Sequence, residues 1–139
     1  LEHQHRFARA HVFARHLRLA EATRRAVKAW GLEILCADPA EYSASLTAIV
    51  MPEGHNADAL RKVVLDRFDM SLGQGLGKLA GTVFRIGHLG WFNDLMLCGT
   101  LCGVEMGLAA AHVPHREGGV QAAIDFLETT PQPALARAA

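Results

Sequence analysis

The residues most suggestive of chemistry lie between positions 73 and 90, in the stretch GQGLGKLAGTVFRIGHLG, where six of eighteen residues are glycine. Gly75-Leu-Gly77-Lys-Leu-Ala80 matches a loose dinucleotide-binding fingerprint, whereas the P-loop pattern fails because Lys78 is followed by leucine. A phosphate-binding loop of the dinucleotide kind follows a strand and opens a helix, whose N-terminus meets the phosphate. Here the loop follows a helical pattern and leads into a strand. The glycines therefore predict a tightly turning loop rather than a nucleotide site.

Arg85 lies in the only apolar run of this stretch, between Phe84 and Ile86. Side chains on a strand alternate between its two faces, so Phe84 and Ile86 point one way while Val83 and Arg85 point the other. We expect the larger residues to face the helices, which leaves Arg85 on the opposite face. A guanidinium there suits a carboxylate or phosphate held by two parallel hydrogen bonds. The pattern alone favours the plainer interpretation, an edge-strand arginine in solvent or in a structural ion pair, and the residues leave the ligand site open as the alternative.

No other motif points to catalysis or to a metal. Cys98 and Cys102 lie one helical turn apart, but the remaining ligand geometry of a metal site is missing, and buried free cysteine is common. The chain contains no GxSxG motif, no HExxH motif and no defensible carboxylate pair. We therefore predict no catalytic residue, no cofactor-binding residue and no metal ligand within this chain.

Residues 95–113 reach the length of a membrane span and contain one charged residue, Glu105. Gly99, Gly103 and Gly107 form a ridge at helical spacing, as in closely packed membrane helices. Glu105 lies near the centre, however, and basic flanks are lacking, so we expect a deeply buried helix of a protein without a membrane contact. The net charge is zero and the basic first helix lacks interleaved aromatic residues, so no nucleic-acid partner is expected.

Apolar periodicity and turn signals predict the element order α-β-β-α-β-α-α. The expected strands are 32–36, 45–51 and 82–86, and the expected helices are 6–30, 57–68, 94–112 and a last one after Gly119. This order predicts an α/β (α+β) fold, a small and mainly antiparallel sheet covered on one face by helices. One domain is expected over 1–139, with a disordered tail at 130–139. Both faces of strand 45–51 are apolar, so a partner or further domain is expected over the second face.

Within the first helix, the spacing of Phe13, Leu17, Val27 and Trp30 places them on one apolar stripe. The three cysteines form no CxxC pair and the chain opens without a signal peptide, so a cytoplasmic location is expected. The first residue is not methionine and no helix cap precedes the first helical pattern. We interpret the chain as a piece of something longer.

The stretch DMSLGQGLGKLAGTVFRIGHLGWFNDLMLCGTLCGVEMGLAAA, residues 69–111, closely resembles the class V, fold-type I aminotransferases that use pyridoxal phosphate. The chain is most similar to the bacterial serine–glyoxylate aminotransferases, in order over residues 12–128. The resemblance implies that this region is the C-terminal small domain, and that the large domain holding pyridoxal phosphate and its Schiff-base lysine is absent. Lys28, Lys62 and Lys78 do not match that lysine, so the fragment alone is expected to be inactive.

The resemblance also implies a role for Arg85. In the family, the arginine of the RIG motif binds the α-carboxylate of the amino donor and of the oxo-acid acceptor, and it maps onto Arg85. Small amino acids and oxo acids are therefore the implied substrates, and the complete enzyme is expected to be a homodimer. Trp91 replaces the small or acidic residue expected there, which makes serine as the donor less secure than the reaction class. The alternative is a stand-alone α/β module that binds a small carboxylate or has a regulatory role.

Overall fold

The structure, a computed structural model, describes residues 2–132, with side chains from residue 9 onward. Its helices are α1 (Glu2–Trp30), α2 (Ala57–Phe68), α3 (Asp94–Ala110) and α4 (Gly119–Thr129), and its strands are β1 (Glu33–Ile34), β2 (Leu46–Val50), β3 (Gly73–Gln74) and β4 (Val83–Gly87). The predicted fold class and element order are confirmed. The structure contains one strand that the sequence did not predict, β3, which lies within the glycine-rich stretch. Residues 133–139 of the tail predicted to be disordered lie outside the described residues.

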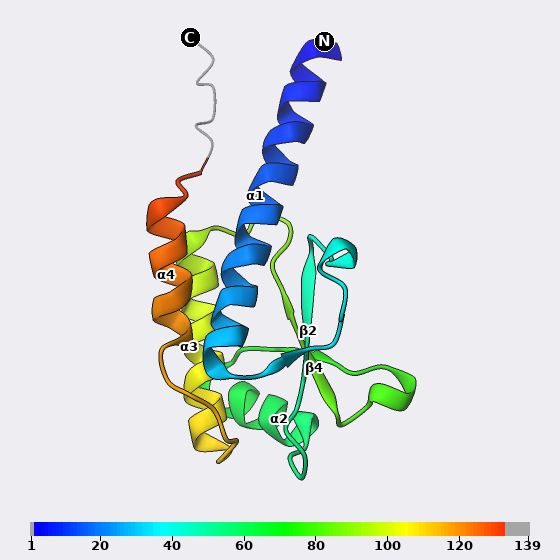
Figure 1. The fold of residues 1–139 in the computed structure, drawn as a ribbon, viewed down its shortest axis with the longest axis vertical. Helices are drawn as coiled ribbons and strands as arrows, with labels where there is room; N and C mark the ends of the chain where they lie inside the picture. The colour runs from blue at the N-terminus through cyan, green and yellow to red at the C-terminus, as the bar shows by residue number, and fades with distance from the viewer. Residues whose placement is uncertain (1, 133–139) are drawn as a thin grey trace.

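The four strands form one antiparallel sheet in the order β1-β2-β4-β3. β2 and β4 pair along their full length, from Leu46 opposite Gly87 to Val50 opposite Val83. Figure 1 shows the helices gathered on one side of this sheet, with α1, α3 and α4 side by side and α2 below them. The predicted arrangement, with helices on one face only, is therefore confirmed.

The core lies between the sheet and the helices. Ile49, Phe84 and Ile86 point toward the helices and are fully buried, and Trp30 at the end of α1 closes the same cluster. Along β2 the burial alternates, because Leu46, Ala48 and Val50 are only half-buried on the far face. None of the four α-helices lies over that face (Figure 1). The sheet therefore offers one apolar, partly open side, and Arg85 emerges on it.

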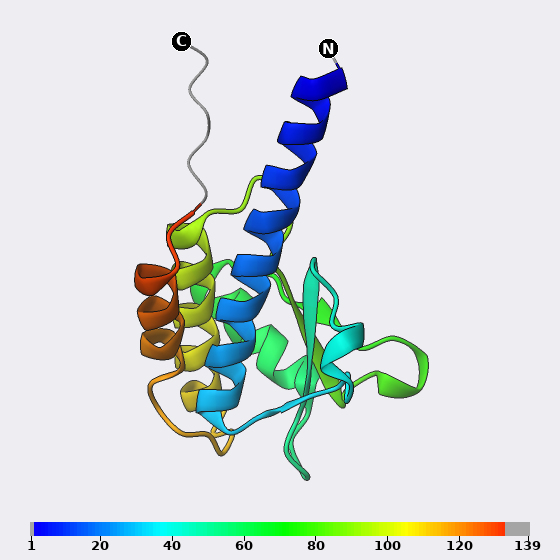
Figure 2. The ribbon, with the colours of Figure 1, turned by 45° about the horizontal axis from the view of Figure 1, so that its top comes forward.

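α1 is longer than the layer it packs against. Val27 and Trp30 are buried, whereas Phe13 and Leu17 are 62% and 56% exposed. The first turns of the helix rise beyond the other elements in two views (Figures 1 and 2). The predicted stripe is therefore buried only in the second half of α1, because the described elements do not reach far enough along the helix to cover Phe13 and Leu17.

Two glycines of the predicted ridge make room for neighbouring residues: Gly107 for α2 and Gly103 for Met70, which follows α2. A Cβ atom at Gly107 would lie 2.4 Å from Cγ2 of Val64, and one at Gly103 would lie 2.7 Å from Cε of Met70. The inner side of α3 is buried as predicted, but its outer side is not: Leu95 is 83% exposed. None of the described helices is long and apolar enough to cross a membrane.

A buried arginine that the sequence did not single out ties three helices together. The Arg18 guanidinium donates to both carboxylate oxygens of Asp94, at 2.6 and 3.0 Å, and so joins α1 to the start of α3. It also donates to the carbonyl oxygen of Leu127 at 2.8 Å and to that of Thr130, both at the end of α4. This arrangement fixes α3 relative to α1, and with it the loop that follows β4.

Candidate substrate-carboxylate site

Arg85 occupies the middle of β4 and is flanked by two very small residues. Its register partners are Ala48 on β2 and Gly73 on β3, and directly opposed residues in a sheet project from the same face. A Cβ atom at Gly73 would lie 3.0 Å from Cβ of Arg85 and 3.2 Å from its Nε. The arginine side chain therefore lies against the bare backbone at Gly73.

The Arg85 guanidinium has no partner among the side chains that the structure describes, which begin at residue 9. Its Nε is buried and makes no hydrogen bond, and none of the ion pairs between described residues involves it. Arg85 brings a planar guanidinium, a fork of hydrogen-bond donors, to this face of the sheet. Of the alternatives left open by the sequence, the structural ion pair finds no support in the described residues. The terminal N–H groups of this half-buried guanidinium likewise make no hydrogen bond within the described residues, and such free donors suit an anionic ligand.

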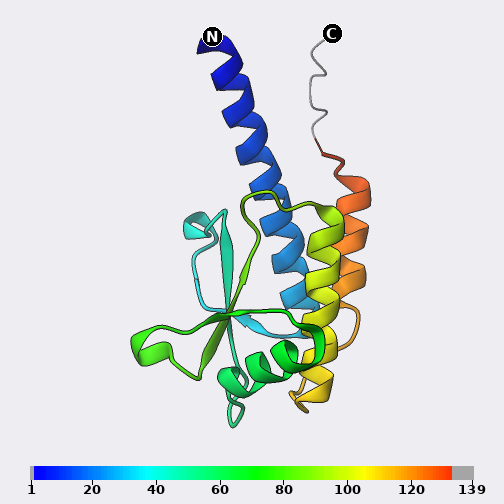
Figure 3. The ribbon, with the colours of Figure 1, turned by 180° about the vertical axis from the view of Figure 1, so that it is seen from behind.

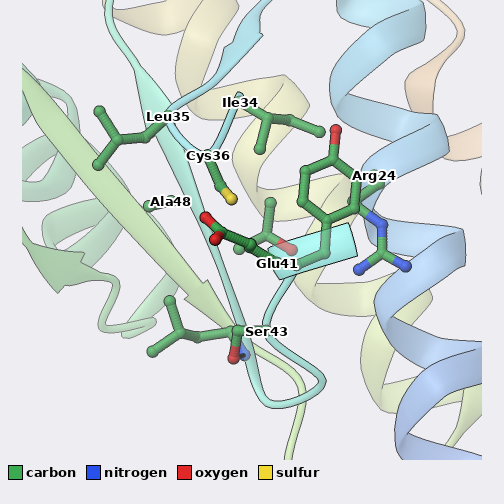
Figure 4. Close-up of a pocket in the computed structure, with 10 residues that line it drawn as sticks. Arg24, Ile34, Leu35, Cys36, Glu41, Ser43 and Ala48 are labelled. Carbon is green, nitrogen blue, oxygen red and sulfur yellow. Dashed lines mark hydrogen bonds between the residues drawn. The ribbon is translucent and has the colours of Figure 1, made fainter. Parts of the chain in front are cut away.

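The sheet edge beside Ala48 carries a cavity of about 180 Å³, but Arg85 does not line it. Its charged wall is Arg24, which already pairs with Glu21 at 3.2 Å and whose guanidinium carbon lies 4.7 Å from the centroid of the Tyr42 ring. Figure 4 shows Arg24 on one side of this cavity and Cys36 and Glu41 on the other. Nε of Arg24 is buried without a hydrogen-bond partner, as is that of Arg85. The Arg24 guanidinium nevertheless already pairs with Glu21, and the Glu41 carboxylate lines the same cavity, so the cavity is a poor site for a carboxylate ligand.

Comparison with known proteins identifies the relatives of this chain. No protein-family model matches it. It is 48% identical over 97 residues to the serine–glyoxylate aminotransferase of Hyphomicrobium methylovorum, a match that covers 70% of the chain and 24% of that protein. It is 43% identical over 129 residues to the L-aspartate–glyoxylate aminotransferase of Paracoccus denitrificans, covering 92% of the chain and 33% of that protein.

Solved structures give the same answer. The pyridoxamine–pyruvate aminotransferase of Mesorhizobium loti superposes with a TM-score of 0.79 at 29% identity, over 85% of this chain and 31% of that one. The ureidoglycine–glyoxylate aminotransferase of Bacillus subtilis superposes with a TM-score of 0.76 at 28% identity, over 82% and 30% of the two chains. The chain belongs to the class V aminotransferase family. It spans about a quarter to a third of the length of these relatives.

The three lysines of this aminotransferase chain do not form a cofactor site within it. Lys28 is exposed on α1, Lys62 is exposed on α2 and pairs with Asp66 at 2.6 Å, and Lys78 is exposed in the 3-10 helix of residues 77–79. A lysine that forms a Schiff base with a cofactor lies in a pocket that shields it from water. All three of these lysines are exposed, so the described residues do not fit pyridoxal phosphate. The described residues also contain no group of three or more side chains able to hold a metal ion.

Behind the arginine strand, on the helix side, lies a buried histidine that the sequence did not reveal. His88 follows β4 directly, donates its backbone N–H to the carbonyl of Ser45 at 2.9 Å, and places its Nε2 2.9 Å from Oγ1 of Thr47. Burial, assisted by the positive charge of Arg24, lowers the pKa of His88 to about 4. The ring is therefore neutral near pH 7. Its contacts hold the ends of β2 and β4 together and so position the strand that carries Arg85.

The loop after His88 is fastened to α1. Arg15 donates from Nη2 to the carbonyl oxygen of Gly90 at 2.6 Å, and His16 accepts the N–H of Gly90 on Nε2 at 3.0 Å. Trp91 follows at once and is 90% exposed. The loop is thus held at its backbone while the indole stands in solvent. The expectation that Trp91 makes serine less secure as the amino donor stays a prediction.

Proposed function

We propose that this chain is the C-terminal small domain of a pyridoxal-phosphate-dependent transaminase, and that it supplies the arginine that binds the substrate carboxylate. The observation that carries the proposal is the unpartnered Arg85 guanidinium lying over Gly73. The proposed reaction of the complete enzyme converts serine and glyoxylate to hydroxypyruvate and glycine, in the cytoplasm. Two relatives are named for glyoxylate but for different amino donors, so glyoxylate as acceptor is better supported than serine as donor.

The contribution of Arg85 to such a reaction is orientation. Both substrates carry a carboxylate next to the reacting carbon, and a bidentate arginine fixes that carboxylate in one plane. Two charge-assisted hydrogen bonds contribute on the order of 2–4 kcal/mol to binding in a partly dry site. Pyridoxal phosphate would supply the electron withdrawal that weakens the bond to the α-hydrogen. Because the described lysines do not fit it, we expect residues outside this chain to hold it.

The test is made on the whole product of the reading frame that encodes this chain. The Arg85→Lys variant should lower kcat/KM for the amino donor and for glyoxylate by about tenfold or more, because a point charge cannot reproduce the planar fork. Arg67→Lys is the matched control, since Arg67 is exposed at the end of α2 and belongs to no ion pair of the described residues. Kinetics of Arg85→Lys that match those of the control would refute the assignment.

The chain by itself should show no transaminase activity. After incubation with pyridoxal phosphate and borohydride, mass spectrometry should find no lysine that is modified selectively. A stoichiometric adduct on Lys28, Lys62 or Lys78 would contradict this prediction. If the reading frame encodes only this chain and the chain still binds glyoxylate through Arg85, the stand-alone binding module replaces the transaminase.

A further inference from the structure

The outer side of α3 carries two free thiols at a spacing that lets them act together. Cys98 and Cys102 lie four residues apart in this helix, so their Cβ atoms are neighbours on one side of it, about 5–6 Å from each other. Cys98 is half-buried and Cys102 is exposed. Seen from behind, α3 lies in front, and no other described element covers its outer side (Figure 3). A small ligand can therefore reach both sulfur atoms of the described chain.

Neither thiol has a partner that explains the pair. No hydrogen bond between described residues involves Cys98 or Cys102, whereas the thiol of Cys36 donates to the carbonyl oxygen of Asp38. A disulfide brings two Cβ atoms to about 3.5–4.5 Å, closer than one helical turn allows, so the pair does not close on itself without distorting α3. Burial, with further contributions from Asp94 and Cys102, raises the pKa of Cys98. Cys98 therefore keeps its proton at neutral pH until a ligand displaces it.

We propose that Cys98 and Cys102 form a two-coordinate site for a soft cation, for which cuprous ion is the probe. A metal bonded to two sulfur atoms at about 2.3 Å each, with the three atoms in line, holds those sulfur atoms about 4.6 Å apart. That span fits two thiolates whose Cβ atoms are one helical turn apart. Thiolates select soft cations such as Cu⁺. Two thiols and one Cu⁺ give one dithiolate complex, with the two thiol protons released to solvent.

The surroundings of the pair do not suit a harder cation. Zn²⁺ in proteins needs at least three protein ligands, and the described residues contain no group of three or more His, Cys, Asp or Glu side chains that could hold a metal ion. The two carboxylates of α3 are engaged with other helices: Asp94 pairs with Arg18 at 2.6 Å. Glu105 accepts the indole N–H of Trp30 at 2.7 Å. No carboxylate of α3 is left for a hard cation, which favours one that two sulfur atoms satisfy.

The space beside the two thiols is open. Gly99 lies between them in the chain, and a Cβ atom at this position would meet nothing within 4 Å. Met106 follows Cys102 by one more turn and is 55% exposed, so the next residue along this side of α3 is also a soft sulfur group and not a charge. A cation between the two thiolates therefore finds room on the side of Gly99.

The test is a titration with cuprous ion under anaerobic conditions, in competition with a chromophoric chelator of Cu⁺, on the whole product of the reading frame that encodes this chain. We expect it to bind one Cu⁺ more than the double variant Cys98→Ser and Cys102→Ser. Each single variant should lower the affinity by about a hundredfold or more, because even residues behind metal ligands change the affinity by up to that factor. Cys36→Ser, at a thiol outside α3, is the matched control and should leave the affinity unchanged.

A relocated thiol tests the spacing rather than the mere presence of cysteine. Cys98→Ala combined with Met106→Cys moves the pair one turn along the same side of α3, and this variant should bind Cu⁺ within about tenfold of the wild type. Cys98→Ala combined with Thr100→Cys places the thiols two residues apart, on different sides of the helix, and should not restore binding. Circular dichroism checks that both variants fold.

Either of two results would overturn the proposal. The first is a whole protein that binds no more Cu⁺ than the double variant. The second is equal affinity of the two relocated pairs, which would show uptake by any exposed thiol without a defined site. Both results are independent of the kinetics of Arg85→Lys, so the failure of this site and the failure of the proposed transaminase function are distinguishable.

Discussion

Gly73 and Arg85 face each other across β3 and β4, and the missing side chain of Gly73 is the space in which the arginine lies. Nε of Arg85 would be 3.2 Å from a Cβ atom at position 73. Gly73 stands in a strand and no left-handed backbone angle is recorded for it, so close approach rather than backbone freedom explains the glycine. On the other side of Arg85, its register partner is Ala48 of β2, whose side chain is a single methyl group. The small size of Gly73 and Ala48 thus determines where the Arg85 side chain can lie.

Enlarging Gly73 should therefore disturb the arginine without unfolding the sheet. In the complete enzyme, we expect Gly73→Val to lower kcat/KM by about tenfold to a hundredfold, since displacement of a positioning group by about 1 Å has effects of that size. Gly73→Ala should give a smaller loss. Gln74→Val introduces the same side chain at the adjacent exposed position and is the control. Steady-state kinetics with glyoxylate decide the matter, and equal rates for Gly73→Val and Gln74→Val would refute the placement of Arg85.

Glu105 is expected to stabilise the start of α4. Its carboxylate accepts the indole N–H of Trp30 and the backbone N–H groups of Gly118 and Val120. Burial alone would raise the pKa of Glu105, but these hydrogen bonds outweigh it and lower the pKa. Glu105→Gln replaces one accepting oxygen by a donor, which should lower the free energy of unfolding by about 1–3 kcal/mol. Urea denaturation of the wild type and of Glu105→Gln measures this difference in the free energy of unfolding.

The control for this prediction is Glu128→Gln, at an exposed residue of α4 with no recorded hydrogen bond or ion pair. Because the pKa of Glu105 is lowered in the folded state, its contribution is present above the ordinary value of 4.5 and is lost as the pH falls through the folded pKa. The difference between wild type and Glu105→Gln should therefore shrink in acid. A difference that grows as the pH falls would contradict this account.

Gly99 and Gly107 of α3 should respond in opposite directions to the same substitution. Gly107→Ala forces a methyl group to within 2.4 Å of Val64, so we expect destabilisation by about 1–3 kcal/mol. Gly99→Ala meets nothing in the monomer and should stabilise the helix by about 0.5–1 kcal/mol. Thermal denaturation of the two variants at a concentration where the chain is monomeric provides the comparison. The same sign for both variants would show that the contact between α2 and α3 is looser than described.

His88 should make the fold sensitive to acid. Its pKa is lowered from 6.5 to about 4 by burial, so the unfolded chain takes up a proton before the folded chain does. The free energy of unfolding should therefore be highest above pH 6.5 and fall as the pH drops from 6.5 toward about 4. His88→Gln, which can still bond to Thr47, should remove most of this dependence in that window.

The control for His88 is His112→Asn, at an exposed histidine with a φ angle of 54°, a conformation that asparagine tolerates. This variant should keep the wild-type pH dependence. Denaturation curves recorded at several pH values distinguish the two. If His88→Gln and wild type lose stability in parallel between neutral pH and pH 4, His88 is not the group responsible.

The sequence alone determined the order of the elements, the antiparallel class of the sheet and the face on which Arg85 emerges. These follow from local rules: period-two alternation separates Arg85 from Phe84 and Ile86, and Asn56 and Asn93 mark the starts of α2 and α3 by capping them. The family resemblance rested on the same local stretch, residues 69–111. These local rules did not predict the exposure of Phe13 and Leu17, because that depends on where the elements packed against α1 end.

Tertiary structure decided everything that depends on residues distant in the chain. The bare backbone beneath Arg85 requires β3 to pair with β4, and two residues of strand within a glycine-rich stretch give no periodic signal. The burial of His88 against Thr47, the contact of Arg18 with Asp94, and the open outer face of α3 are likewise set by packing between elements. Burial and pairing are properties of the folded chain as a whole, whereas propensity and alternation act within a few residues of one another.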